Sequence, residues 1–78
     1  MATVMVVDDE PGIVESLEKI FEREELSVVT AASGEEALAI LQKQPIDVVL
    51  TDLRMARLTG LDLLRTVRAE YPETEVVL

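Results

Sequence analysis

Two short apolar runs, each followed at once by aspartate, constrain this chain more than any other feature of its sequence. Residues 4–7 are unbroken by polar side chains and stop at Asp8 and Asp9. Residues 46–51 predict another strand, whose core at residues 48–50 is again continuous and apolar, and this strand stops at Asp52. Short, continuous runs rich in β-branched residues are typical of strands that are buried on both faces of a parallel sheet. The pattern therefore predicts a sheet that helices cover on both sides.

Segments with helical periodicity separate these apolar runs. Pro11 stands where a first helical turn tolerates proline, and apolar residues then recur at helical spacing at Ile13, Leu17, Ile20 and Phe21. This spacing predicts an amphipathic helix that ends near Glu25. Residues 26–30 predict a second strand, and a capping-box pattern at residues 33–36 predicts a second helix that runs to about Lys43.

The last third of the chain continues the alternation. A loop through Gly60 leads to a predicted helix with Leu61, Leu64 and Val67 on one face and Arg65 and Arg68 on another. Tyr71 and Pro72 stop this helix, and residues 76–78 predict a fourth strand. Strands and helices alternate throughout, which predicts an α/β fold with a parallel sheet, helices on both faces and one domain at residues 1–78.

The apolar strand at the carboxyl end indicates that this domain is incomplete. A domain does not normally end inside an apolar strand, because a hydrophobic sheet edge would then be exposed. We therefore expect a fold that is truncated after its fourth strand. If the 78 residues are the whole molecule, the exposed fourth strand predicts self-association into a homo-oligomer.

The composition excludes several kinds of site. The chain has no Cys and no His, which removes disulfides, thiol and imidazole chemistry and the usual transition-metal ligands. Its net charge of −9 argues against nucleic acid and membrane surfaces, since both attract clustered Lys and Arg. No stretch reaches the roughly 18 apolar residues of a membrane span, and the amino terminus lacks the pattern of a signal peptide. We expect a cytoplasmic protein.

Three carboxylates follow the two apolar runs and form the candidate site. Ligands of parallel α/β sheets bind outside the carboxyl ends of the strands, which is where Asp8, Asp9 and Asp52 lie. If the first and third strands are neighbours, these carboxylates converge, and a cation relieves their repulsion. Mg²⁺ fits best, because it prefers oxygen ligands, keeps several waters and completes its shell with phosphate oxygens.

A purely structural interpretation of the same residues stays open at this point. Aspartate is common at helix caps and turns, so Asp9 or Glu10 would cap the first helix and Asp52 would start a turn. Two acid-terminated buried strands in one short chain favour the metal-assisted phosphoryl site over this interpretation.

Two motifs and their spacing resemble the receiver domain of two-component response regulators. The first is Val-Val-Asp-Asp-Glu-Pro at residues 6–11, and the second is Val-Val-Leu-Thr-Asp-Leu-Arg-Met at residues 48–55, followed by Gly60. The resemblance covers the whole chain and implies a flavodoxin-like sheet of strand order 2-1-3-4-5, with the fourth helix, fifth strand and fifth helix absent here. Residues 52–55 and 72–77 also look like receivers of sigma-54-dependent transcription regulators.

The resemblance implies a signalling role rather than an enzyme. Asp52 would accept a phosphoryl group from a phosphohistidine of a sensor histidine kinase. Asp9, Asp52 and the backbone carbonyl of Arg54 would bind Mg²⁺, with Asp8 acting mainly through bound water. The domain would then regulate an output domain outside this chain, one that acts in transcription, without itself contacting nucleic acid.

The sequence departs from the family pattern at three places. Met55 is followed by Ala56 where many receivers have proline, and Thr59 precedes Gly60 where aspartate is common. Ala56 predicts a more mobile loop, and Thr59 can still cap the third helix. The Ser or Thr after the fourth strand and the Lys after the fifth would lie beyond Leu78.

Three other classes of molecule compete with this interpretation. Haloacid dehalogenase-like phosphatases also place an Asp nucleophile after a buried first strand, but they carry a second Asp where this chain has Glu10. A flavodoxin-like nucleotide binder would need a Gly-rich or Ser/Thr-rich phosphate loop, which does not follow the first strand. The third alternative is a non-functional fragment that associates with itself.

Overall fold

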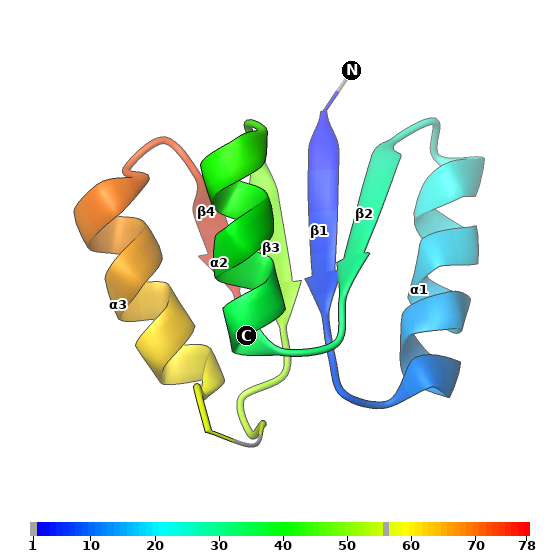
Figure 1. Ribbon diagram of the computed structural model, residues 1–78. Coiled ribbons are helices and arrows are strands. Elements are labelled where there is room, and N and C mark those ends of the chain that lie inside the picture. Colours follow the sequence, from blue (N-terminus) through cyan, green and yellow to red (C-terminus); the bar gives the residue numbers. More distant parts are fainter. Residues whose placement is uncertain (1, 56) are drawn as a thin grey trace.

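The computed structural model describes residues 2–55 and 57–78, and in that part of the chain four strands alternate with three helices (Figure 1). The elements are β1 (Thr3–Val7), α1 (Pro11–Arg23), β2 (Ser27–Ala31), α2 (Gly34–Lys43), β3 (Val48–Thr51), α3 (Gly60–Glu70) and β4 (Glu75–Val77). The alternation expected from the sequence is confirmed.

The four strands form one parallel sheet in the order β2-β1-β3-β4. β1 therefore lies between β2 and β3, with Val6 opposite Thr30 on one side and Leu50 on the other. This order confirms the flavodoxin-like fold class and makes the first and third strands neighbours. All four strands run in the same direction, so their carboxyl ends meet at one edge of the sheet (Figure 1).

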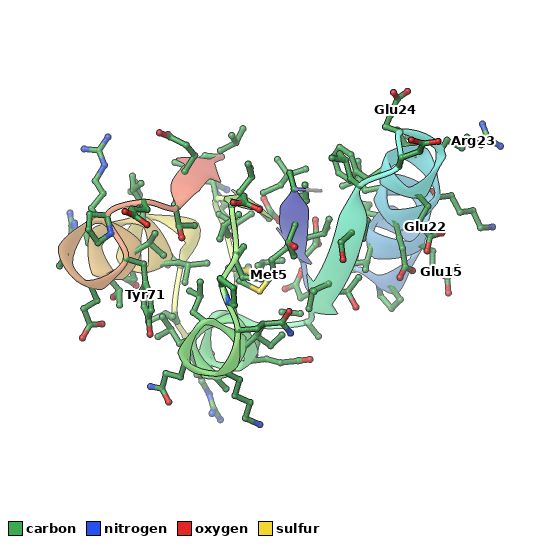
Figure 2. The ribbon with its side chains drawn as sticks, turned by 90° about the horizontal axis from the view of Figure 1, so that it is seen from above. Met5, Glu15, Glu22, Arg23, Glu24 and Tyr71 are labelled. Carbon is green, nitrogen blue, oxygen red and sulfur yellow. The ribbon has the colours of Figure 1, made fainter. Side chains whose placement is uncertain are left out.

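The helices lie on both faces of the sheet, and the main core fills only one side. α2 and α3 cover one face and α1 lies across the other, and Figure 2 shows Met5 of β1 pointing toward α2. The core between the sheet and the helices α2 and α3 includes Met5, Val49, Leu63 and Val67, each with no exposed surface. This dense layer fixes the positions of β1 and β3.

The prediction that both acid-terminated strands are buried on both faces is confirmed for β1 and wrong for β3. Residues 4–7 are all buried, but burial alternates along β3, where Val48 and Leu50 are only partly buried. α1 packs mainly over β2 and β1, so in the described part of the chain no helix covers β3 on that face. One side of β3 is therefore half open.

The periodicity of α1 is real, but its apolar residues are only partly covered. The structure describes all 13 residues of α1, and none of them is buried. Ile13 and Ile20 are 43% and 53% exposed. The helix ends at Arg23, close to the predicted end near Glu25. The amide of Leu26 donates to the carbonyl of Phe21, and Glu25 takes a left-handed φ of 61°. These are the features of a Schellman cap, here without glycine.

The buried face of α3 differs from the one that the sequence predicts. Leu63 and Val67 are fully buried, whereas Leu61 is 45% exposed. The helix begins at Gly60, and its first turn sets Leu63 rather than Leu61 against the sheet. Val67 is the one predicted residue of that face that is fully buried.

Both predicted helix caps are present, but the capping box at Ser33 has only one of its two hydrogen bonds. Ser33 Oγ accepts a hydrogen bond from the amide of Glu36, but the Glu36 carboxylate accepts from Ala32 rather than from Ser33. Thr59 caps α3, as expected. Ala56 lies outside the described residues, so the more mobile loop expected there stays a prediction.

Candidate functional site

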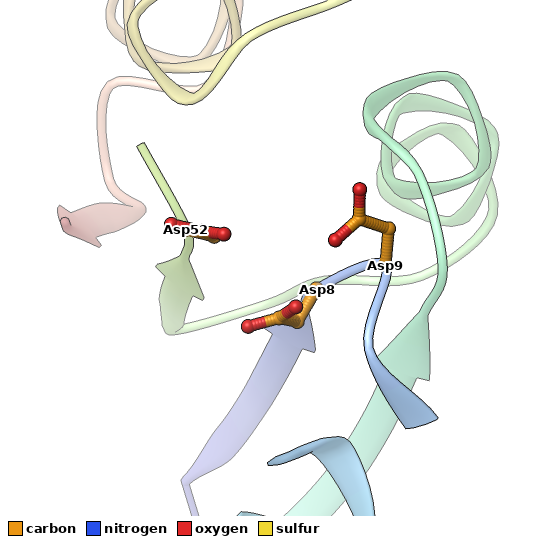
Figure 3. A group of neighbouring side chains, drawn as sticks. All are labelled: Asp8, Asp9 and Asp52. Atoms are coloured by element: carbon orange, nitrogen blue, oxygen red, sulfur yellow. The ribbon is translucent and has the colours of Figure 1, made fainter. Parts of the chain in front are cut away.

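The neighbouring ends of β1 and β3 bring Asp8, Asp9 and Asp52 together. The amide of Asp52 donates to the carbonyl of Val7 over 3.1 Å, which sets Asp52 beside Asp8 at the strand ends. One carboxylate oxygen from each of the three aspartates lies within 4.8 Å of the others. Figure 3 shows the three side chains facing a common space. The convergence that the sequence predicts is therefore present.

The three aspartates differ in burial and in their hydrogen bonds. Asp8 is only 8% exposed, and its Oδ1 accepts from the amide of Glu10 over 2.9 Å, at the start of α1. Asp9 and Asp52 are exposed. The structural interpretation thus holds for a different residue, because Asp8 rather than Asp9 or Glu10 orders the entry to α1. Asp52 Oδ1 lies 3.5 Å from the amide of Arg54, too long for a strong turn-forming bond.

The donor set of the three aspartates fits a hard divalent cation. All three donors are carboxylate oxygens, the ligand type that Mg²⁺ prefers. Two oxygens that each lie about 2.1 Å from one Mg²⁺ are at most about 4.2 Å apart. Separations within 4.8 Å are compatible with a single cation that the carboxylates bind directly or, for one of them, through water.

Arg54, the fourth predicted ligand residue, lies close to Asp52 in the chain and in space. Its side chain is exposed, and its amide is the group that approaches Asp52 Oδ1. The predicted ligand is its backbone carbonyl, which belongs to the same loop after β3. The loop from Asp52 to Arg54 therefore carries two of the four predicted ligand residues.

Sequence reasoning missed two contacts that hold this loop. The hydroxyl of buried Thr51 donates to the carbonyl oxygen of Asp52 over 3.1 Å, and the amide of Gly60 donates to the carbonyl oxygen of Leu53 over 3.1 Å. The signal for Gly60 was visible, because it is one of only three glycines and stands at the start of a helix. No periodicity argument shows what such a glycine touches.

The start of α3 beside this loop is held by a complete capping box. The amide of Asp62 donates to Thr59 Oγ1 over 3.2 Å, and the amide of Thr59 donates to Asp62 Oδ2 over 3.0 Å. Two hydrogen bonds lower the pKa of Asp62 below its usual value. The larger effect comes from the backbone amide of Thr59 and the smaller one from its hydroxyl. The cap therefore stabilises the ionised carboxylate and fixes the end of the loop.

Further acidic side chains surround the three aspartates. A groove of about 290 Å³ beside Asp8 and Asp9 has Val14 and Ala31 in its wall and is bordered by three glutamates: Glu15, Glu18 and Glu36. The guanidinium of Arg57 lies 3.9 Å from a carboxylate oxygen of Glu35, and both side chains are exposed. The site therefore has a negative potential that favours cations.

The helices α1, α2 and α3 do not resemble membrane spans. Within residues 2–55 and 57–78, none of them combines the length and the apolar character needed to cross a bilayer.

Comparison with known proteins places these features in a family. The family model for the response regulator receiver domain matches residues 4–78. The hydrogenase transcriptional regulatory protein HoxA of Cupriavidus necator is 46% identical over 72 residues, which are 92% of this chain and 15% of HoxA. The response regulator GtcR of Aneurinibacillus migulanus is 33% identical, over 97% of this chain and 31% of GtcR. The chain thus spans less than a third of each of these relatives.

Solved structures agree with the sequence matches. The response regulator protein TrrA of Thermotoga maritima, solved in complex with Mg²⁺ and BeF, has a TM-score of 0.95 and 33% identity over 100% of this chain and 68% of TrrA. A chain in the crystal structure of the histidine kinase ThkA in complex with TrrA also matches, with a TM-score of 0.91 and 33% identity. The match covers 97% of this chain and 66% of the matched chain. The fold described above agrees with these matches. The chain belongs to the family of response regulator receiver domains.

Proposed function

We propose that this domain accepts a phosphoryl group on Asp52 from a phosphohistidine of a sensor histidine kinase. The observation that carries the proposal is the convergence of Asp8, Asp9 and Asp52 at the ends of β1 and β3. Asp52 is exposed, so an incoming phosphoryl group can reach it. The relative TrrA, which has been solved with a histidine kinase, supports a kinase as the partner.

The proposed step needs little covalent chemistry from the protein. A carboxylate oxygen of Asp52 attacks phosphorus, the new P–O bond forms an acyl phosphate, and the P–N bond to the kinase histidine breaks. The departing imidazole nitrogen keeps the electron pair of that bond. Transfer of this kind depends chiefly on positioning and on neutralising charge. The domain changes state rather than turning over a substrate, so its role is that of a receiver and not of an enzyme.

Four residues hold the cation in this proposal. Asp9, Asp52 and the backbone carbonyl of Arg54 are direct ligands of Mg²⁺, and Asp8 acts mainly through a bound water. When bound, Mg²⁺ supplies charge neutralisation for the phosphoryl oxygens. The hydrogen bond from Glu10 to Asp8 already occupies one oxygen of that carboxylate, which favours the indirect role for Asp8.

The output of the domain lies outside this chain in the proposal. Relatives with a matching receiver segment are named transcriptional regulatory proteins, and this segment is only 15% of HoxA. We assign control of transcription to a further domain, because the net charge of −9 disfavours direct contact of this domain with DNA.

The intact mass of the chain after incubation with acetyl phosphate tests the proposed acceptor. We expect one added phosphoryl group that requires Mg²⁺ and is absent from Asp52→Asn. Glu73→Gln, which removes an exposed acid between α3 and β4, is the matched control and keeps the modification. A folded chain that gains no phosphoryl group contradicts the proposal. Continuous hydrolysis of p-nitrophenyl phosphate would instead favour a phosphatase.

We also propose that the 78-residue chain associates with itself through β4. Within the described residues β4 is an edge strand, and Val77 and Leu78 are 49% and 51% exposed. Residues 54–78 contain four acids and four bases, so the excess negative charge lies elsewhere and does not oppose contact at this edge. Exposed apolar edge strands favour pairing with a second copy.

Light scattering during size exclusion tests this association. We expect the apparent mass to rise with concentration, and Val77→Lys to shift the chain toward monomer because it places a charge on the exposed edge. Glu73→Lys adds the same side chain in the preceding loop and serves as the control. A folded monomer at every concentration contradicts self-association and leaves the phosphoryl proposal unaffected.

A further inference from the structure

The loop that carries Asp52 and Arg54 is pressed against the first residue of α3. Gly60 donates its amide to the carbonyl oxygen of Leu53 over 3.1 Å. A Cβ atom at Gly60 would overlap the main-chain carbonyl oxygen of Asp52 and would lie 3.0 Å from the Cα of Leu53. Both neighbours are backbone atoms, so neither can rotate away as a flexible side chain would.

The contact surrounds the peptide unit between the two proposed ligands. Asp52 is the residue before Leu53 and Arg54 is the residue after it, so Gly60 fixes the main chain at the midpoint of the ligand loop. The other side of the loop is also fixed, because the Asp52 amide bonds to Val7 and Thr51 bonds to the Asp52 carbonyl. A shift at Gly60 therefore moves both oxygen ligands of that loop together.

We infer that Gly60 is a positioning residue, whose missing side chain lets the start of α3 hold the Asp52 carboxylate and the Arg54 carbonyl at the spacing a divalent cation needs. This inference rests on the proposed function. It assigns an effect on cation affinity to a residue that supplies no ligand atom itself. Groups that orient metal ligands commonly change affinity by 10-fold to 100-fold when they are altered.

The other two glycines provide a comparison within the same chain. At Gly12 a Cβ atom would meet nothing within 4 Å, so Gly12→Ala makes the same chemical change in open space. At Gly34 the nearest atoms would be Leu58 Cδ2 at 2.5 Å and Leu58 Cβ at 2.8 Å, which belong to a side chain outside the ligand loop. Of the three glycines, only Gly60 lies against the backbone of the ligand loop.

Binding of Mn²⁺ alone, measured from the electron paramagnetic resonance signal of the free ion, tests the inference. We expect Gly60→Ala to weaken Mn²⁺ binding at least tenfold while circular dichroism shows a folded chain. Two variants serve as controls. Gly12→Ala makes the same substitution in open space, and Val67→Ala destabilises the chain through a cavity in the hydrophobic core beside α3. The affinity of each for Mn²⁺ should stay within twofold of that of the parent chain. Gly60→Ala within twofold of the parent overturns the inference. A parent chain that binds no Mn²⁺ overturns the proposed function and this inference with it.

Amide hydrogen exchange in the unaltered chain keeps the test decisive if Gly60→Ala fails to fold. The Gly60 amide is bonded to the ligand loop, and the Tyr71 amide is bonded to Val67 at the other end of α3. We expect saturating Mg²⁺ to slow exchange at Gly60 at least fivefold more than at Tyr71. Equal slowing of both amides shows that the cation does not act on the contact at Gly60, and it overturns the inference.

Discussion

The amide of Asp52 donates a hydrogen bond of 3.1 Å to the carbonyl oxygen of Val7, the residue before Asp8. This bond continues the pairing of β1 with β3 to the first residue beyond β3. The acidic residues of the site are therefore held together by the main chain, although their side chains repel each other. Replacing one carboxylate by an amide should change the charge of the site and leave its backbone frame in place.

Replacing Asp9 by asparagine should stabilise the chain in the absence of divalent cations. Its carboxylate oxygen lies within 4.8 Å of oxygens of Asp8 and Asp52, and like charges at that distance repel by about 1 kcal/mol in a water-like medium. We expect Asp9→Asn to raise the free energy of unfolding in EDTA by about 1 kcal/mol and to reduce the stabilisation by Mg²⁺. Urea unfolding with and without Mg²⁺ measures both effects. Glu73→Gln controls for the change in net charge, and an equal gain in that variant would contradict the local repulsion.

Asp62 should make the stability of the chain depend on pH in the acidic range. Its pKa is lowered in the folded state, chiefly by the backbone bond from Thr59, so the unfolded state binds the proton more tightly. The contribution of Asp62 is therefore fully present above its unfolded pKa and is lost as pH falls through its folded pKa. Urea unfolding at a series of pH values between about 7 and 3 should show a shallower pH dependence for Asp62→Asn. An unchanged pH dependence in Asp62→Asn would show that Asp62 does not contribute to it.

Two leucines of α3 should differ sharply when truncated. Leu63 is fully buried, so Leu63→Ala should cost about 3 kcal/mol through lost burial and a residual cavity. Leu61 is 45% exposed, and Leu61→Ala should cost less than about 1 kcal/mol. Urea unfolding of the two variants compares the same substitution on one helix. Similar losses would mean that the buried face of α3 is the one that the sequence predicts.

Replacing Glu25 by glycine should stabilise the folded chain. It holds a left-handed φ of 61° in the cap of α1, a conformation that costs an ordinary L residue about 1 kcal/mol more than glycine. We expect Glu25→Gly to raise the free energy of unfolding by roughly 0.5 to 1 kcal/mol, and the melting temperature should rise with it. Glu24→Gly is the control, because Glu24 has an ordinary φ of −87° and gains nothing from glycine. A loss of stability in Glu25→Gly would contradict the strain at this cap.

The sequence was sufficient for the fold because its local signals agree with one another. Residues 4–7 form an unbroken apolar run and are buried, and Thr59 caps α3 as its position predicts. The three aspartates could be placed together because parallel strands end at one edge of a sheet. Each of these conclusions needs only periodicity and the direction of strands.

The remaining features depend on packing that no periodicity encodes. An apolar run such as residues 48–50 cannot show that α1 leaves one face of β3 half open. Leu61 and Leu63 are equally apolar, and the start of α3 at Gly60 decides which of them is buried. The role proposed for Gly60 depends on a contact with Asp52, and contacts of that kind follow only from three-dimensional structure.

The central place of β1 also determines when the site can form. β1 is the first strand of the chain, yet more than half of the chain separates Val4 from its partner Val48. Pairing between such distant segments is a slow step in folding, and Asp52 meets Asp9 only after that step. A bound cation therefore has little to hold before β3 docks, and it acts on the native state. Divalent cations should lengthen the lifetime of the folded domain against unfolding and leave its rate of folding nearly unchanged.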